Sequence, residues 1–282
     1  DFEPREYQRF CEGWAASVRE SMRPGAPLLA FSGTRTFHRA ICGIEDAGFT
    51  VKDCLSWTYG QGFPKSHDIS KAIDKAAGAE REVVGEKEVS RDLSRDGKKG
   101  DMAISREPVE ATTVDVTAPA TDEAERWDGY GTALAPSWEP ICYATNPREG
   151  TYAENALEHR VAGLNIDGAR IETEGERPNR EHDTTPGFAD VGVSGGSKAD
   201  GTTTQGRWPA NVVLDEVAAE GLDASRYFYT SKASSSDRNA GLPDGRENDW
   251  PTVKPTDLMG WLLRLVEMPS DNLILDPFAG SG

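Results

Sequence analysis

The last seven residues of the chain, 276–282, have the types and order that most directly suggest ligand chemistry. They follow an apolar run at 272–275, which predicts a strand ending in an acidic residue and a Gly-x-Gly turn. α/β sheets hold nucleotide-like cofactors in this way, because glycine lets the backbone approach the ligand and a helix N-terminus follows. A Gly-x-Gly alone also occurs in ordinary strand-to-helix turns. No Gly-Lys-Ser/Thr follows that would make it a phosphate loop.

A second segment, 249–255, leads into the helix that precedes this motif. Pro255 suits the first helical position, and Thr252 can supply a hydroxyl near the helix start. The alternative is that the segment only starts a helix. The chain begins without methionine and stops inside its motif, so we expect it to be an excerpt from a longer protein.

The cysteines and histidines do not predict a metal site. They are widely spaced, with no Cys-x-x-Cys pair and no ligand spacing between the two residue types. We expect reduced thiols, no metal and a reducing cytoplasm. No apolar run reaches membrane-spanning length. The residues concerned are Cys11, Cys42, Cys54, Cys142, His38, His67, His159 and His182.

The chain carries 48 acidic and 31 basic residues, a net charge of −17. Taken alone, this charge argues against a polyanionic partner. Either the protein does not touch nucleic acid, or the acidity is spread over the whole surface and a local basic face remains. A high-salt cytoplasm would explain such a surface, since salt screens the charges. Stability that does not rise with added salt would count against that hypothesis.

The elements that would position these residues alternate between helix and strand at both ends of the chain. Helix, strand, helix, strand is the order of a parallel sheet with crossover helices, and the two ends together supply enough strands for one sheet. We expect irregular structure over 85–131 and 172–206, where hydrophobic periodicity is lost. Predicted helices cover 6–22, 36–47, 67–77, 154–160 and 255–266; predicted strands cover 27–31, 49–57, 138–144, 207–214, 227–230 and 272–276, with a strand pair over 162–171.

The segment 57–67 is rich in glycine and aromatic residues and follows a predicted strand at its C-terminal end, where ligands bind on open α/β sheets. With this segment, the chain resembles amino-group-specific DNA methyltransferases, which methylate adenine N6 or cytosine N4 with S-adenosylmethionine. It is most similar to the permuted, phage-like subgroup, in which the cofactor motif comes last. The strings that carry the resemblance are 23–25, 28–31, 57–60, 62–67, 137–141, 229–241, 251–255 and 276–282.

The resemblance implies an α/β, Rossmann-like methyltransferase sheet with an irregular inserted target-recognition region. The implied parts are 1–84 on the catalytic side, 85–248 for target recognition and 249–282 on the cofactor side. Lys254 would neutralise the cofactor carboxylate, or it is a solvated lysine at a helix start. The residues implied at the S-adenosylmethionine site are Asp276, Pro277, Phe278, Gly280, Ser281, Gly282, Thr252, Lys254 and Pro255.

Double-stranded DNA is the implied substrate, and a restriction endonuclease is a candidate partner. Trp57 and Tyr59 would contact the extruded base, although Trp57 also suits a core position at a strand end. A histidine base is not required, because the amino group is activated by alignment and loses its proton afterwards. The residues that would contact phosphates, unless they are simply solvated charges, are Lys65, His67, Arg207, Lys232 and Arg238.

One family feature is missing from the chain. The catalytic tetrapeptide of this family is Asp/Asn/Ser-Pro-Pro-Tyr/Phe, and no Pro-Pro pair occurs in these 282 residues. In the permuted order it would stand shortly before Asp1, so we expect no catalytic residue here and no activity from the chain alone. The alternatives are a methyltransferase acting on RNA or protein, and an inactive DNA-binding remnant.

Overall fold

The computed structural model describes residues 3–60, 62, 65–89, 112–173, 177–181, 198–220, 222, 225, 228–231, 254–269 and 273–278. The chain divides into two compact units, each described by itself. The sheet unit comprises residues 1–60, 138–237 and 254–282, and the hairpin unit comprises 61–137 and 238–253. These units describe how residues pack together. They do not test the functional ranges predicted from the sequence (1–84, 85–248 and 249–282), which stay predictions. In the described part of the chain, no helix is long and apolar enough to cross a membrane.

The sheet unit is built on a five-stranded sheet with the order β1-β5-β2-β8-β9. β2 pairs parallel with β8, and β8 with β9, whereas β5 is antiparallel to both β1 and β2. The α/β class is thus confirmed, but the expectation of an all-parallel sheet is wrong at β5. The strands are β1 (Pro27–Phe31), β2 (Thr50–Thr58), β5 (Trp138–Thr145), β8 (Val212–Asp215) and β9 (Tyr229–Ser231).

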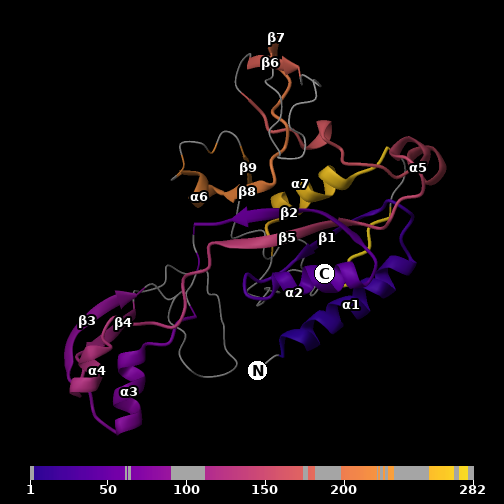
Figure 1. Cartoon of the computed structure of the whole chain (residues 1–282). Helices are drawn as coiled ribbons and strands as arrows, with labels where there is room; N and C mark the ends of the chain where they lie inside the picture. The colour runs from indigo at the N-terminus through magenta and orange to yellow at the C-terminus, as the bar shows by residue number, and fades with distance from the viewer. Residues whose placement is uncertain are drawn as a thin grey trace, which may run out of the picture. The chain divides into compact units, whose positions relative to one another are not determined.

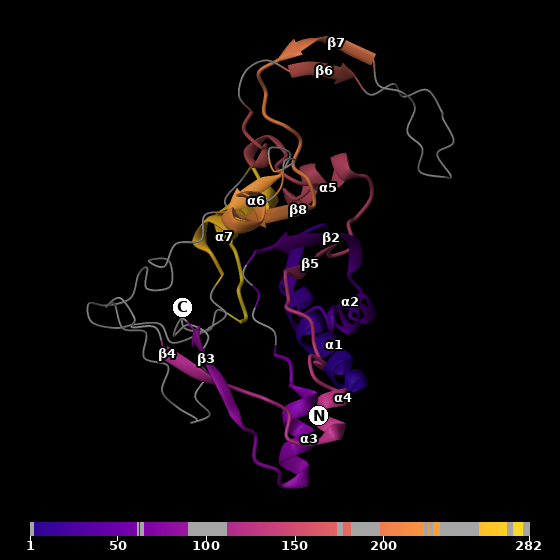
Figure 2. The ribbon, with the colours of Figure 1, turned by 90° about the vertical axis from the view of Figure 1, so that its left-hand side faces the viewer.

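Helices cover both faces of this sheet (Figures 1 and 2). On one face, α1 (Pro4–Glu20) and α2 (Phe37–Asp46) contribute to a buried cluster with Cys142 and Ala144 of β5. On the other face, the apolar side of α7 (Thr256–Val266) packs against β2, β5 and β8. Side chains alternate along β5, so neighbouring residues enter opposite clusters. The α7 residues in the second cluster are Leu258, Trp261, Leu262 and Leu265.

The structure also corrects the predictions for residues 162–171 and 172–206 of the sheet unit. The strand pair expected over 162–171 is instead a short 3-10 turn, η2 (Asp167–Ala169), because the Asn165 side chain accepts the Gly168 N–H at 3.0 Å and favours the turn. The polar stretch 172–206 contains a hairpin of β6 (Arg177–Glu181) and β7 (Lys198–Thr203). The remaining helices are α5 (Tyr152–His159), which begins with a capping box, and α6 (Glu216–Glu220).

The hairpin unit corrects the expectation of irregular structure over 85–131. It contains α3 (Ile69–Ala77), α4 (Asp122–Arg126) and an antiparallel hairpin of β3 (Val83–Val89) and β4 (Thr112–Thr117). Val83, Val84, Val114 and Val116 of this hairpin are exposed, so its strands are held by backbone pairing, and these valines give no buried apolar face for a sequence pattern to reveal.

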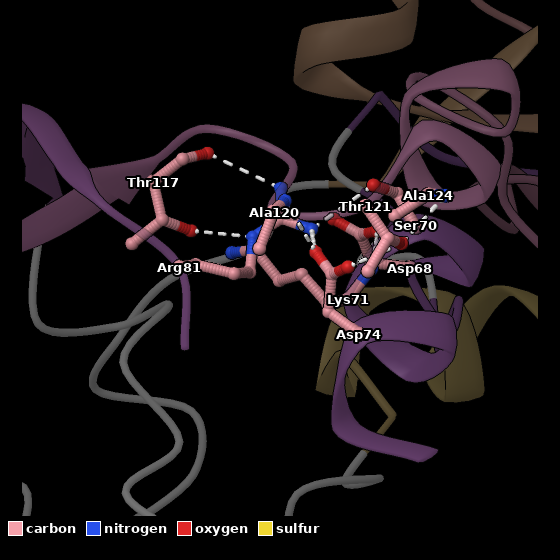
Figure 3. Close-up of polar contacts among 9 residues, drawn as sticks. All are labelled: Asp68, Ser70, Lys71, Asp74, Arg81, Thr117, Ala120, Thr121 and Ala124. Carbon is pink, nitrogen blue, oxygen red and sulfur yellow. Dashed lines mark hydrogen bonds and ion pairs between the residues drawn. The ribbon is translucent and has the colours of Figure 1, made fainter. Parts of the chain in front are cut away.

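A buried carboxylate joins the elements of the hairpin unit (Figure 3). Asp74 of α3 forms an ion pair with Arg81 at 2.7 Å and accepts hydrogen bonds from the Thr121 hydroxyl at 2.8 Å and the Ala120 N–H at 3.0 Å. Burial alone would raise the pKa of Asp74, but these hydrogen bonds and the Arg81 charge outweigh it, so the pKa is lowered. Arg81 also donates to Thr117 at the end of β4, which connects the hairpin to α3.

Candidate functional site

Aromatic and charged side chains gather at one end of β1, β2 and β5. Phe31 is the last residue of β1, and Trp57 lies near the end of β2. Because β5 runs the other way, its second residue, Glu139, reaches the same edge and is the direct ladder partner of Trp57. Lys254, just before α7, completes the group. These four residues and Tyr59 are called the Lys254 cluster below.

The ammonium group of Lys254 has three partners in this cluster. Its Nζ lies 2.6 Å from Glu139 Oε2, 5.2 Å from the centre of the Phe31 ring and 5.3 Å from that of Trp57. Both distances are within the range of cation–π attraction. The Lys254 and Glu139 side chains are 21% and 26% exposed, so the pair is only partly screened by water.

Trp57 and Tyr59 form the aromatic wall of the cluster. Their ring centres are 5.1 Å apart and tilted by 49°. Trp57 is 8% exposed and belongs to the core, and its Nε1 has no hydrogen-bond partner among the described residues. Tyr59 is only partly buried; burial, and then the negative charge of Glu139, raise the pKa of its phenol. Of the two rings, Tyr59 is therefore the one that a ligand can reach.

The chain beyond Tyr59 is fixed by Asp215, the last residue of β8. Its carboxylate accepts the Gly60 N–H at 3.1 and 3.2 Å and the Ala218 N–H at 2.7 Å. Gly60 packs so closely that an added Cβ would lie 2.7 Å from Cβ of Val217. The ends of β2 and β8 are thus held together directly beside the aromatic wall.

With this geometry established, comparison with known proteins decides the family. The sequence matches the DNA methylase family over residues 1–282. The chain belongs to the DNA methylase family. It is also similar to the Type II methyltransferase M.HindIII of Haemophilus influenzae, with 24% identity over 165 residues. That match covers 57% of this chain and 40% of the relative, so the chain spans less than half of the relative's length. No solved structure matches the chain.

The end of the DNA methylase chain differs from the predicted strand. Residues 273–276 form no strand, and Leu273, Ile274 and Leu275 are exposed. The apolar pattern predicted a strand, but a strand also needs a hydrogen-bonding neighbour, and the structure describes none for this segment. Asp276 accepts the N–H of Phe278 at 2.9 Å, and the Phe278 ring meets Trp14 of α1 edge-on at 5.5 Å.

The other predicted cofactor residues are only partly described. Pro255 is buried at the N-cap of α7, one position before the predicted one, and Pro277 lies in the exposed turn with Asp276. Lys254 is placed in the cluster described above. The predicted residues outside the described part are Thr252, Gly280, Ser281 and Gly282.

The predicted DNA contacts of the methylase fall in both units, and two of them lie outside the described residues. Lys65 and His67 are exposed in the hairpin unit, where the His67 N–H donates to the Thr132 hydroxyl at 2.9 Å. Arg207 lies in the sheet unit, where its backbone forms a two-way bridge with Ile171. Lys232 and Arg238 lie outside the described residues. The roles of all five stay predictions.

Sequence reasoning missed Phe31, Glu139 and Asp215 as parts of this site. Two of them had a visible signal: Glu139 is an acid within the otherwise apolar strand 138–144, and Asp215 is an acid directly after an apolar run. Within the described ranges, no three His, Cys, Asp or Glu side chains lie together as a metal site would need.

Proposed function

We propose that the chain serves methyl transfer from S-adenosylmethionine to an exocyclic amino group of adenine or cytosine in double-stranded DNA. The family match over residues 1–282 is the observation that carries this proposal. The site geometry supports it, because the Lys254 cluster lies at the C-terminal ends of the parallel strands β1 and β2, the edge where α/β sheets bind ligands. The name of the relative, a Type II methyltransferase, agrees.

For the cofactor, we propose that the segment around Asp276 and Phe278 holds the methionine end of S-adenosylmethionine. An exposed ring and a carboxylate suit a sulfonium and an ammonium group, since both carry positive charge. The bound cofactor would supply the electrophilic methyl group. The backbone N–H groups of Gly280, Ser281 and Gly282 would donate to its carboxylate. Pro277 has no N–H and would shape the turn that carries them. Thr252 and Pro255 would line the same pocket.

We propose a different role for Lys254 from the one that the resemblance implies. Its ammonium is already neutralised by Glu139 at 2.6 Å, so it offers the cofactor carboxylate no uncompensated charge in this arrangement. It fits better as a residue that fixes the start of α7. Tyr59, which is less buried than Trp57, is the proposed contact for an extruded base, with Trp57 supporting its ring from behind.

For DNA binding, we propose phosphate contacts by a local set of basic residues that offset the net charge of −17. Residues 85–248 would read the recognition sequence, and a restriction endonuclease would be a functional partner. The proposed contacts are Lys65, His67, Arg207, Lys232 and Arg238.

The test is incorporation of labelled methyl groups from S-adenosylmethionine into DNA by the full-length product of the gene that encodes this chain. Mass spectrometry of the digested DNA should show N6-methyladenine or N4-methylcytosine. The 282-residue chain alone should show no transfer, because it lacks the Pro-Pro tetrapeptide. Labelling of RNA or protein but not DNA would overturn the proposed substrate, and transfer by the chain alone would overturn the predicted inactivity.

A further inference from the structure

Four elements of the sheet unit meet at the ammonium group of Lys254. Phe31 comes from β1, Trp57 from β2 and Glu139 from β5, and Lys254 itself stands directly before Pro255, the N-cap of α7. Glu139 and Lys254 are 115 positions apart in the chain. A contact that joins three strands to the start of a helix restricts the direction in which that helix leaves the sheet.

Glu139 is the charged partner in this contact. The two rings attract the ammonium, but ring faces alone do not replace the water that a lysine loses on partial burial. The carboxylate at 2.6 Å supplies a charge-assisted hydrogen bond that does. Without it, the flexible lysine stem would let the ammonium return to solvent, because the side chain is already 21% exposed.

The position of Lys254 matters for the segment that α7 precedes. The apolar side of α7 packs on the sheet through Leu258 and Trp261, which are 0% and 2% exposed, but an apolar face alone permits small rotations and shifts. The contact at Lys254 adds a directional restraint at the first turn. From the end of α7 the chain runs to Asp276, where the proposed cofactor segment begins.

We propose that Glu139 is a positioning residue for cofactor binding: it holds Lys254 between Phe31 and Trp57 and so fixes the start of α7. This inference rests on the proposed function, since it concerns the affinity for S-adenosylmethionine. Glu139 itself need not touch the cofactor, and its effect passes through Lys254.

The test is a double-mutant cycle on the full-length product of the gene that encodes this chain, with Glu139→Gln, Lys254→Met and the double variant. Each single change should raise the KM and the Kd for S-adenosylmethionine up to about fivefold, the size expected for one partly exposed ion pair. The KM for DNA and kcat should stay within about twofold. The double variant should be no worse than either single one, because both remove the same restraint.

The matched control is Glu149→Gln. Glu149 Oε2 lies 2.9 Å from His159 Nε2 in the same unit, so this variant makes the same change of charge at another side-chain contact away from the site. It should leave all constants unchanged. A charge-reversed pair, Glu139→Lys with Lys254→Glu, should recover part of the cofactor affinity that Glu139→Lys loses.

The outcomes separate this inference from the function on which it rests. Wild-type protein that neither binds S-adenosylmethionine nor methylates DNA overturns both. Wild-type activity with an unchanged cofactor KM in Glu139→Gln overturns only the role of Glu139. Losses that add in the double variant show that Lys254 acts on the cofactor independently of Glu139, and they also overturn the inference. If Glu139→Gln does not fold, the KM for S-adenosylmethionine of Lys254→Met and of the charge-reversed pair tests the role of Glu139 instead.

Discussion

Replacing Asp215 tests how the aromatic wall of the site is anchored. Its Oδ1 accepts the N–H groups of both Gly60 and Ala218, and Oδ2 shares the Gly60 N–H at 3.2 Å. The residue is 8% exposed, so water does not readily take over these bonds. Asp215→Ala leaves both donors without this acceptor, whereas Asp215→Asn keeps an oxygen in the Oδ1 position.

The two variants should therefore differ in the free energy of unfolding. A hydrogen bond to a charged group contributes about 1.5 to 3 kcal/mol, and loss of a helix N-cap costs about 1 kcal/mol. Since the Ala218 bond is itself the N-cap of α6, the contributions overlap, and about 3 kcal/mol is expected for Asp215→Ala. Asp215→Asn loses only the charge assistance, about 1 kcal/mol. Urea unfolding followed by circular dichroism measures both values.

Glu216→Ala is the matched control, because this neighbouring acid is exposed and should change stability by less than about 0.5 kcal/mol. Equal losses for the alanine and asparagine variants would refute the argument, since they would show that the geometry of Oδ1 does not matter. So would a loss below about 1 kcal/mol for Asp215→Ala, which would mean that solvent satisfies the Gly60 and Ala218 donors.

Three further outcomes are expected. Trp261→Ala should lose about 4 kcal/mol in urea unfolding, because the ring is 2% exposed, whereas Leu263→Ala on the exposed side of α7 should lose less than about 1 kcal/mol. Burial raises the pKa of the Cys142 thiol to about 12, so mass spectrometry should find it unalkylated in the folded chain at neutral pH and alkylated after unfolding. The pKa of Asp74 is lowered, so its contribution to stability is present above its unfolded-state pKa and is lost as the pH falls through its folded-state pKa; thermal unfolding against pH should lose part of its acid slope in Asp74→Asn.

The local elements were predictable where one face is buried. The strand 27–31 has the bounds of β1, because its apolar run lies between Pro-Gly and Ser-Gly breaks. The helix around Trp261 begins one residue later than predicted, with Pro255 as its N-cap. The direction of β5 was not predictable, since alternation of side chains is the same for parallel and antiparallel neighbours. The β3-β4 hairpin was missed because Val83, Val84, Val114 and Val116 are exposed and form no buried apolar face.

In the site, too, single residues could be predicted from the sequence, but contacts between distant strands could not. Trp57, Tyr59 and Lys254 stood out by their residue type and their place near strand or helix ends, and the structure brings these three together. That Phe31 and Glu139 lie beside these three was not predictable, because it depends on the register of β5 against β1 and β2. Register between strands more than 80 positions apart is fixed by packing of the whole sheet, and no local pattern encodes it.

The energetics of the Glu139–Lys254 pair give a last prediction that separates positioning from stability. A partly exposed ion pair contributes about 1 kcal/mol or less, which is too little to draw together groups 115 positions apart against the entropy of closing that loop. Burial of the α7 face must do that, with Trp261 alone worth several times as much. The free energy of unfolding of Glu139→Gln should therefore stay within about 1 kcal/mol of the wild-type value, while its affinity for the cofactor falls up to about fivefold. If Glu139→Gln instead lost both stability and cofactor affinity, as we expect for Trp261→Ala, Glu139 would stabilise the fold and would not select the placement of α7.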